Sequence, residues 1–218
     1  MSKTNPFIVI EALDAGGSQT QTDLLVQRLR KENYEVMQLH FPQEDRATGR
    51  LIYDKFLLPK NKRRFSRREQ ALLYIQDFYS RADDITIART SRERKIVVSD
   101  RYCTSTMAYQ TIGLSGKQRA AMLDWLTWLT YEGTPALPKP DLVIFLDTPV
   151  KVSLERLEHK KKDWFETKAK LSAIRRSYTM LARDQRWRII ESMDTDHNVR
   201  TREDLHAEVW KAVYPLLD

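Results

Sequence analysis

The chain has 218 residues, of which 41% are hydrophobic and 31% are charged. This length and composition fit a single soluble α/β domain and argue against intrinsic disorder. No run approaches the ~20 apolar residues of a membrane span, and a single cysteine, Cys103, excludes an internal disulfide framework. The polar residues 1–6 lack the features of a signal peptide. We therefore expect a cytoplasmic protein with no membrane partner.

The formal net charge is +7. Such an excess of positive charge suits a polyanionic partner, either free nucleotides or nucleic acid, although a solvated basic surface explains it as well. The most basic stretch, residues 60–68, contains only one aromatic residue, Phe65. Binding to single-stranded nucleic acid usually needs several stacking aromatics, so nucleic acid is an unlikely partner.

In chain order, the first predicted unit is a buried strand over residues 7–13, a glycine turn over 15–18, and a helix with leucines at helical spacing. A second strand over 34–40 follows, and Phe41-Pro42 ends it. Residues 45–58 suggest a short helix with a loop. A long helix is predicted over 67–94, with Ser66 and Glu69 placed as a capping box.

The second half continues the alternation. The predicted strands cover residues 95–100, 141–147 and 187–191, and the predicted helices cover 104–111, 115–131, 150–159, 166–183 and 201–216. Ser115 and Thr201 are the expected N-caps of two of these helices. Five short apolar strands alternating with helices predict an α/β fold, a five-stranded parallel sheet flanked by helices on both faces, in one domain over 1–218.

Ligands of such sheets bind beyond the carboxyl ends of the strands. Here the first strand leads into a loop that partly matches the phosphate-binding pattern G-x-x-x-x-G-K-[ST]. Ala12 takes the first glycine position, Gly17 the second, Ser18 the lysine position and Gln19 the metal-binding hydroxyl position. Backbone N–H groups at a helix N-terminus still favour an anion, but the fixed positive charge is missing. Taken alone, this segment is equally well explained as an ordinary strand-to-helix turn.

The whole arrangement resembles the thymidylate kinase family. The family loop E-G-x-D-G-x-G-K-S/T-T-Q stands here as residues 11–21, and four further segments match in order. They are Phe41-Pro42 for F-P, residues 100–110 for D-R-Y-x-x-S-x-x-A-Y-Q, residues 140–156 for P-D-L…L-D…L-E-R, and residues 163–166 for the lid motif D-R-F-E. The resemblance spans nearly the whole chain, and residues 100–110 are its most specific part.

The resemblance implies a P-loop NTPase-like fold with a short basic lid at about residues 157–166. It also implies transfer of the γ-phosphate of ATP to dTMP, giving dTDP, with Mg²⁺ as cofactor and a homodimer as the assembly. Arg101 would bridge the acceptor phosphate and the donor γ-phosphate. Asp100 would position magnesium or Arg101, Asp14 would contact the acceptor, and Glu166 would approach the acceptor from the lid.

The remaining roles implied by the resemblance concern binding. Gln110 would hydrogen-bond the pyrimidine edge, Tyr109 would crowd the 2′ position of the sugar, and Phe41 with Tyr74 would sandwich the base. The expected substrate-binding residues are Phe41, Pro42, Arg46, Tyr74, Phe78, Arg81, Ser105, Tyr109 and Gln110. The expected ATP-binding residues are Ala15, Gly16, Gly17, Ser18, Gln19, Thr20, Arg156, Lys160, Lys161 and Lys162, with Asp100 and Gln19 as metal ligands.

The sequence also departs from the family pattern. Phe78 stands where the family often has an arginine that donates to the base, and Arg81, one turn onward, is a possible substitute. Glu44 stands at the position of an arginine for the acceptor phosphate, with Arg46 two residues later, and Trp164 replaces the lid arginine. Since Ser18 carries no charge, the basic residues of the lid region are expected to supply the positive charge that the loop lacks.

These departures leave alternatives open. One is a catalytically impaired homologue that binds nucleotide without turning it over. Another is a kinase for a different deoxynucleoside monophosphate.

Overall fold

The computed structural model describes residues 4–57, 65–158 and 167–217. Its centre is a five-stranded, all-parallel sheet with the strand order β2-β3-β1-β4-β5, which confirms the predicted architecture. The strands are β1 (Phe7–Ala12), β2 (Glu35–His40), β3 (Lys95–Asp100), β4 (Leu142–Asp147) and β5 (Arg188–Glu191). Each begins within one residue of its predicted start, so the five apolar runs were interpreted correctly.

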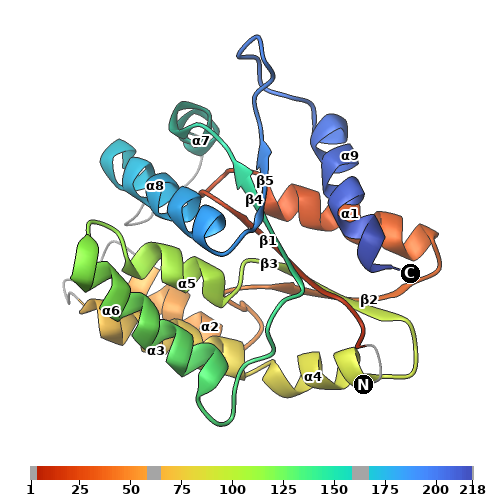
Figure 1. Ribbon diagram of the computed structural model, residues 1–218, viewed down its shortest axis with the longest axis horizontal. Coiled ribbons are helices and arrows are strands. Elements are labelled where there is room, and N and C mark those ends of the chain that lie inside the picture. The colour runs from red at the N-terminus through yellow and green to blue at the C-terminus, as the bar shows by residue number, and fades with distance from the viewer. Residues whose placement is uncertain (1–3, 58–64, 159–166, 218) are drawn as a thin grey trace.

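Helices cover both faces of the sheet, because the alternating side chains of the central strand are buried on each side (Figure 1). Ile8 and Ile10 of β1 pack in a cluster with α1 (Ser18–Lys31) and α9 (Arg202–Val213). Phe7 and Val9 face a second, larger cluster built mainly with α3 (Arg67–Tyr79), α5 (Cys103–Gln110) and α8 (Lys168–Asp184). Burial on both faces explains why β1 is apolar at every position except Glu11.

The predicted long helix over residues 67–94 was wrong, because α3 ends at Tyr79 and a separate helix, α4 (Ala82–Thr90), follows. The Ser80 hydroxyl donates to the carbonyl oxygen of Asp77 at 2.7 Å, and Arg81 leaves helical geometry with φ −121° and ψ 1°. The side chain of Arg81 then reaches Gln43 and Asp84. The contact with Gln43, 38 residues away, cannot be predicted from a helical pattern along the chain.

The three helices for which the sequence predicts an N-cap residue, Ser66, Ser115 or Thr201, begin directly after that residue. Ser66 and Glu69 form both hydrogen bonds of the capping box, and the Thr201 hydroxyl accepts from the N–H of Asp204. Ser115 occupies the expected N-cap position of α6 (Gly116–Thr127), but without a hydrogen bond from its side chain. Residues 45–58 hold α2 (Ala47–Leu51) and a π-helical segment, Ile52–Leu57.

The remaining elements are α7 (Val150–Leu157), a π-helical segment at Trp128–Glu132 and a final 3₁₀ turn at Tyr214–Leu216. Within the described ranges, no helix combines the length and the apolar character needed to cross a bilayer.

Candidate active site

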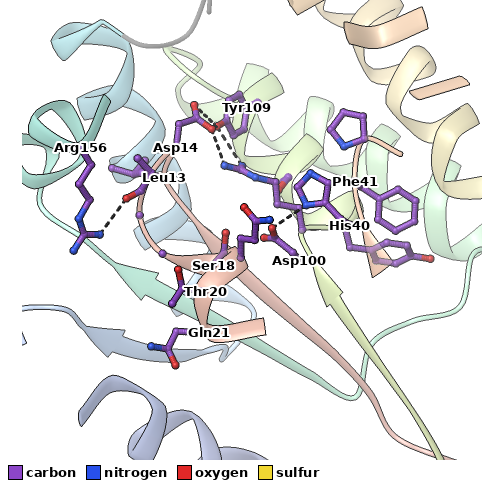
Figure 2. A pocket seen from close by; sticks show the side chains of 18 of the residues that line it. Leu13, Asp14, Ser18, Thr20, Gln21, His40, Phe41, Asp100, Tyr109 and Arg156 are labelled. Carbon is purple, nitrogen blue, oxygen red and sulfur yellow. Dashed lines mark hydrogen bonds and ion pairs between the residues drawn. The ribbon is translucent and has the colours of Figure 1, made fainter. Parts of the chain in front are cut away.

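A cavity of about 580 Å³ lies at the carboxyl edge of the sheet, where the ends of β1, β2 and β3 meet. It is also lined by α5 and by the last residues of α7 (Figure 2). This is the edge at which parallel sheets bind their ligands. The predicted site residues that line the cavity are Asp14, Ala15, Gly16, Gly17, Ser18, Gln19, Thr20, Phe41, Pro42, Tyr74, Phe78, Asp100, Arg101, Ser105, Tyr109, Gln110 and Arg156.

The loop between β1 and α1 has the course of a phosphate-binding loop. Gly17 precedes α1 with φ 105°, and Ala15 also takes a left-handed conformation with φ 55°. The N–H of Gly16 donates to the carbonyl oxygen of Leu13 at 2.8 Å, and the hydroxyl of Thr148 donates to the carbonyl oxygen of Gly16 at 2.9 Å. No side chain caps α1, so the first N–H groups of the helix are available to an anion.

Arg156 brings a positive charge to this loop from α7. Its guanidinium donates to the carbonyl oxygen of Ala15 at 3.1 Å, and its Nη1 lies 3.9 Å from the place that a Cβ on Gly17 would occupy. Figure 2 shows the side chain reaching the loop from the side of the cavity opposite Asp100. The loop therefore has a cation beside it even though Ser18 stands at the lysine position.

Arg101 lines the cavity directly after β3. Its Nη2 contacts Oδ1 of Asp14 at 2.6 Å, and the Tyr109 hydroxyl donates to Oδ2 of Asp14 at 3.1 Å. Burial lowers the pKa of Arg101, but the neighbouring Tyr109 and Asp14 outweigh that effect and hold the pKa well above its ordinary value. Arg101 is thus a permanent, oriented cation that is only 16% exposed.

Asp100 has one engaged and one free carboxylate oxygen. Oδ2 hydrogen-bonds Nδ1 of His40 at 2.9 Å, whereas Oδ1 is buried and has no hydrogen-bond partner among the described residues. A hard cation such as Mg²⁺ binds through one or two carboxylate oxygens plus substrate phosphates. The free Oδ1 fits this requirement, and Gln19 is exposed in the first turn of α1.

The end of the cavity furthest from Arg156 is aromatic. Phe41 and Phe78 pack edge to face with ring centroids 4.9 Å apart, and Tyr74 lines the same end. Gln110 also lines the cavity; it is 2% exposed, and its Nε2 lies 3.5 Å from Oε1 of Gln70. Flat rings with one buried amide suit a nucleobase, which offers a π-face and a hydrogen-bonding edge.

Two predicted residues do not line the cavity. Arg81 donates through Nε to Oε1 of Gln43 at 2.6 Å and through Nη1 to Asp84 at 3.0 Å. Arg46 lies 3.7 Å from the same Asp84 carboxylate. The break between α3 and α4 turns Arg81 toward these partners, so the structure gives no support to Arg81 or Arg46 as acceptor contacts. Glu166, Lys160, Lys161, Lys162 and most of the predicted lid lie outside the described residues.

Sequence reasoning missed several lining residues. They include Thr106, His40, Tyr53, Arg200 and Arg202. Arg200 precedes α9 and Arg202 is its first residue, and neither belongs to a motif of the sequence analysis. Sequence reasoning also assigned no role to Glu11, although an acidic residue in an otherwise apolar strand can be recognised in the sequence.

Three features together define a P-loop kinase-like nucleotide-binding protein. They are an anion-binding loop after the central strand of a parallel sheet, a buried arginine beside that loop, and aromatic side chains suited to a base. A family model described as thymidylate kinase matches residues 10–202. The chain is 34% identical over 214 residues to a probable thymidylate kinase of Thermococcus onnurineus, covering 93% of this chain and 94% of that one. It is 27% identical over 209 residues to a thymidylate kinase of Fervidobacterium nodosum, covering 94% and 96%. This chain belongs to the thymidylate kinase family.

The fold agrees with a solved structure. A thymidylate kinase from Candida albicans superposes with a TM-score of 0.76 at 21% identity, covering 100% of this chain and 96% of that one. At this identity the likeness shows the fold alone.

Proposed function

We propose that this protein transfers the γ-phosphate of ATP to dTMP, giving dTDP and ADP. The observation that carries the proposal is Arg101, held by Asp14 between the loop before α1 and the aromatic end of the cavity. A planar, permanently charged fork in that position is suited to contact two phosphate groups at once. Family membership points to the same activity.

The lining of the cavity separates a donor end from an acceptor end. The donor phosphates are assigned to the N-terminus of α1 and Arg156, with Arg200 and Arg202 further along. The base of the acceptor is assigned to Phe41 and Tyr74, where Gln110 offers an amide to its edge. Phosphoryl transfer requires little covalent chemistry from the protein, so the positioning of the substrates and electrostatic stabilisation account for most of the catalysis.

We further infer that the phosphate loop lacks the positive charge of the usual lysine and that Arg156 supplies this charge instead. Ser18 is buried at 6% exposure and contributes a hydroxyl, whereas Arg156 already touches the loop at Ala15. A guanidinium beside the donor phosphates would stabilise the charge that develops during transfer, as a lysine in the loop does. The lysines at 160–162 could act alongside it, since they follow Arg156 closely in the chain.

Magnesium is proposed as the cofactor, with Asp100 and Gln19 as the residues that would hold it. The support is the unpartnered, buried Oδ1 of Asp100 in the cavity wall. When bound, magnesium would neutralise charge on the donor phosphates.

The experiment is a coupled assay of ADP release with purified protein, ATP, dTMP and magnesium, accompanied by calorimetry with dTMP alone. Turnover that depends on dTMP supports the kinase. Binding of dTMP without turnover would identify the catalytically impaired homologue, and absence of both signals from folded protein would refute the proposal. A panel of deoxynucleoside monophosphates in the same assay tests whether another acceptor is preferred over dTMP.

Two properties remain predictions: homodimer formation, which the resemblance implies, and location in the cytoplasm, which the sequence composition favours. Homodimer formation is compatible with Leu72 of α3, which is 49% exposed, and with Trp128, which is 55% exposed. Analytical ultracentrifugation tests it directly. Location in the cytoplasm is the second and is tested by fractionation of cells.

A further inference from the structure

Glu11 is a fully buried carboxylate in a strand that is otherwise apolar. Such burial is costly unless hydrogen-bond donors surround the charge. Here both oxygens are occupied: Oε1 accepts from the N–H of Tyr102 at 3.2 Å and from the Thr104 hydroxyl. Oε2 accepts from the hydroxyls of Ser105 at 2.5 Å and Tyr178 at 2.9 Å. Four donors from two segments, residues 102–105 and α8, thus converge on one side chain.

Three of those donors belong to the residues that directly follow Arg101. Arg101 itself has φ 66°, a left-handed conformation that costs a non-glycine residue about 1 kcal/mol or more. Strand β1 also fixes the other side of this turn, because the N–H of Arg101 donates to the carbonyl oxygen of Ile10 at 3.0 Å. The strained turn is therefore held by two consecutive residues of β1, Ile10 before it and Glu11 after it.

Glu11 also acts on Arg101 electrostatically. Burial raises the pKa of Glu11, and the nearby guanidinium of Arg101 opposes that rise. Because Asp14 contacts the same guanidinium at 2.6 Å, carboxylates on both sides of Ala12-Leu13 hold Arg101. The fourth donor, Tyr178, comes from α8 and stacks on Phe145 with ring centroids 5.0 Å apart, so its hydroxyl is held at a fixed place.

We propose that Glu11 is a positioning residue for the phosphoryl transfer: it holds the left-handed turn at Arg101 in the one conformation that places the guanidinium in the cavity. It does not line the cavity and so acts through Arg101. The proposal rests on the proposed function, in which Arg101 contacts both phosphate groups.

The test is a double-mutant cycle of Glu11→Gln and Arg101→Ala, with kcat and the KM for dTMP measured in each background. Glutamine keeps the shape but has one carbonyl oxygen, so about half of the donors lose their acceptor. In the wild-type background, Glu11→Gln is expected to lower kcat roughly 10- to 100-fold. In the Arg101→Ala background the same change is expected to lower kcat about twofold or less, because residues that act as one unit are not additive.

A matched control is Asp141→Asn at the other end of β1, where Asp141 accepts from the N–H of Phe7 at 2.7 Å. This variant is expected to lower the melting temperature without changing kcat. If Glu11→Gln lowers kcat equally in both Arg101 backgrounds, or leaves kcat unchanged, the proposal is overturned.

A milder variant covers the case in which Glu11→Gln does not fold. Tyr178→Phe keeps the stacking on Phe145 and removes one donor, and its expected loss is roughly 3- to 10-fold in kcat, again absent in the Arg101→Ala background. An additive loss there overturns the proposal.

Failure of the proposed function is distinguishable. If the wild-type protein shows no turnover, the same cycle is run on the affinity for dTMP measured by calorimetry. Coupling between Glu11 and Arg101 in that affinity supports the positioning role, and additivity rejects it.

Discussion

Replacement of Arg156 by alanine is the sharpest test of how the loop works without its lysine. The guanidinium donates to the carbonyl oxygen of Ala15 at 3.1 Å and so lies beside the loop whose N–H groups would hold a phosphate. Two unit charges about 4 Å apart near a protein surface interact by about 4 kcal/mol. Loss of one preorganised donor in comparable sites costs about 3–4 kcal/mol of transition-state stabilisation. Because Arg156 is exposed, screening reduces this, and we expect kcat to fall about 100-fold.

The assay is steady-state ADP release at saturating ATP and dTMP. Lys151→Ala provides the matched control, since Lys151 is another cation of α7, is 87% exposed and contacts Glu155 only at 3.9 Å. It should leave kcat unchanged. Lysine placed in the loop by Ser18→Lys should recover part of the activity that Arg156→Ala loses, because the charge would return to the same phosphates by another route.

If Arg156→Ala keeps kcat within threefold of the wild type, the inference about Arg156 is refuted. The triple variant of Lys160, Lys161 and Lys162 to alanine then becomes the decisive measurement. A large loss there would assign the compensating charge to those lysines, and unchanged turnover in both would show that the loop works without an added cation.

Three further predictions follow from the contacts of single residues. Gln110→Ala removes the amide from the base end and should raise the KM for dTMP about 10-fold, measured in the ADP-release assay, with a smaller change in kcat. Ser66→Ala breaks the capping box of α3 and should lower the free energy of unfolding by about 1 kcal/mol in urea. Burial raises the pKa of Asp77, so its contribution to stability is complete below the ordinary pKa of about 3.9 and is lost as pH rises through the raised value. The wild type should therefore lose stability relative to Asp77→Asn as the pH rises above about 4, and a constant difference in denaturation midpoints would contradict this.

The sheet and much of the site could be predicted from the sequence, because they depend on local patterns. The buried strands are apolar at nearly every position, and the residues after them meet at one edge by the geometry of parallel sheets. Asp14, Phe41 and Arg101 were placed in this way, and the structure brings all three to one cavity.

Contacts between segments that are far apart in the chain could not be predicted from the sequence. By the family pattern Arg81 was a possible substitute for an arginine that donates to the base, yet its guanidinium binds Gln43, 38 residues away, and does not line the cavity. The role of Arg156 depends on the direction of α7 relative to the loop, which residue counting does not give. Glu11 was visible as an acid in an apolar strand, but its four donors come from segments up to 167 residues away in the chain.

The phosphate loop can lose its lysine and remain an anion site because the site is made of backbone atoms. A Cβ on Gly16 would lie 2.8 Å from both the Cβ of Ala12 and the carbonyl oxygen of Leu13, which is too close for the loop to keep its course. Charge has only to be near the phosphates, and Arg156 supplies it from another helix. We therefore expect Gly16→Ala to abolish detectable ATP binding in calorimetry, whereas Ser18→Ala retains it within a few-fold, since only one hydroxyl is removed. Equal losses in the two variants would show that the side chain at 18, and not the backbone, holds the anion.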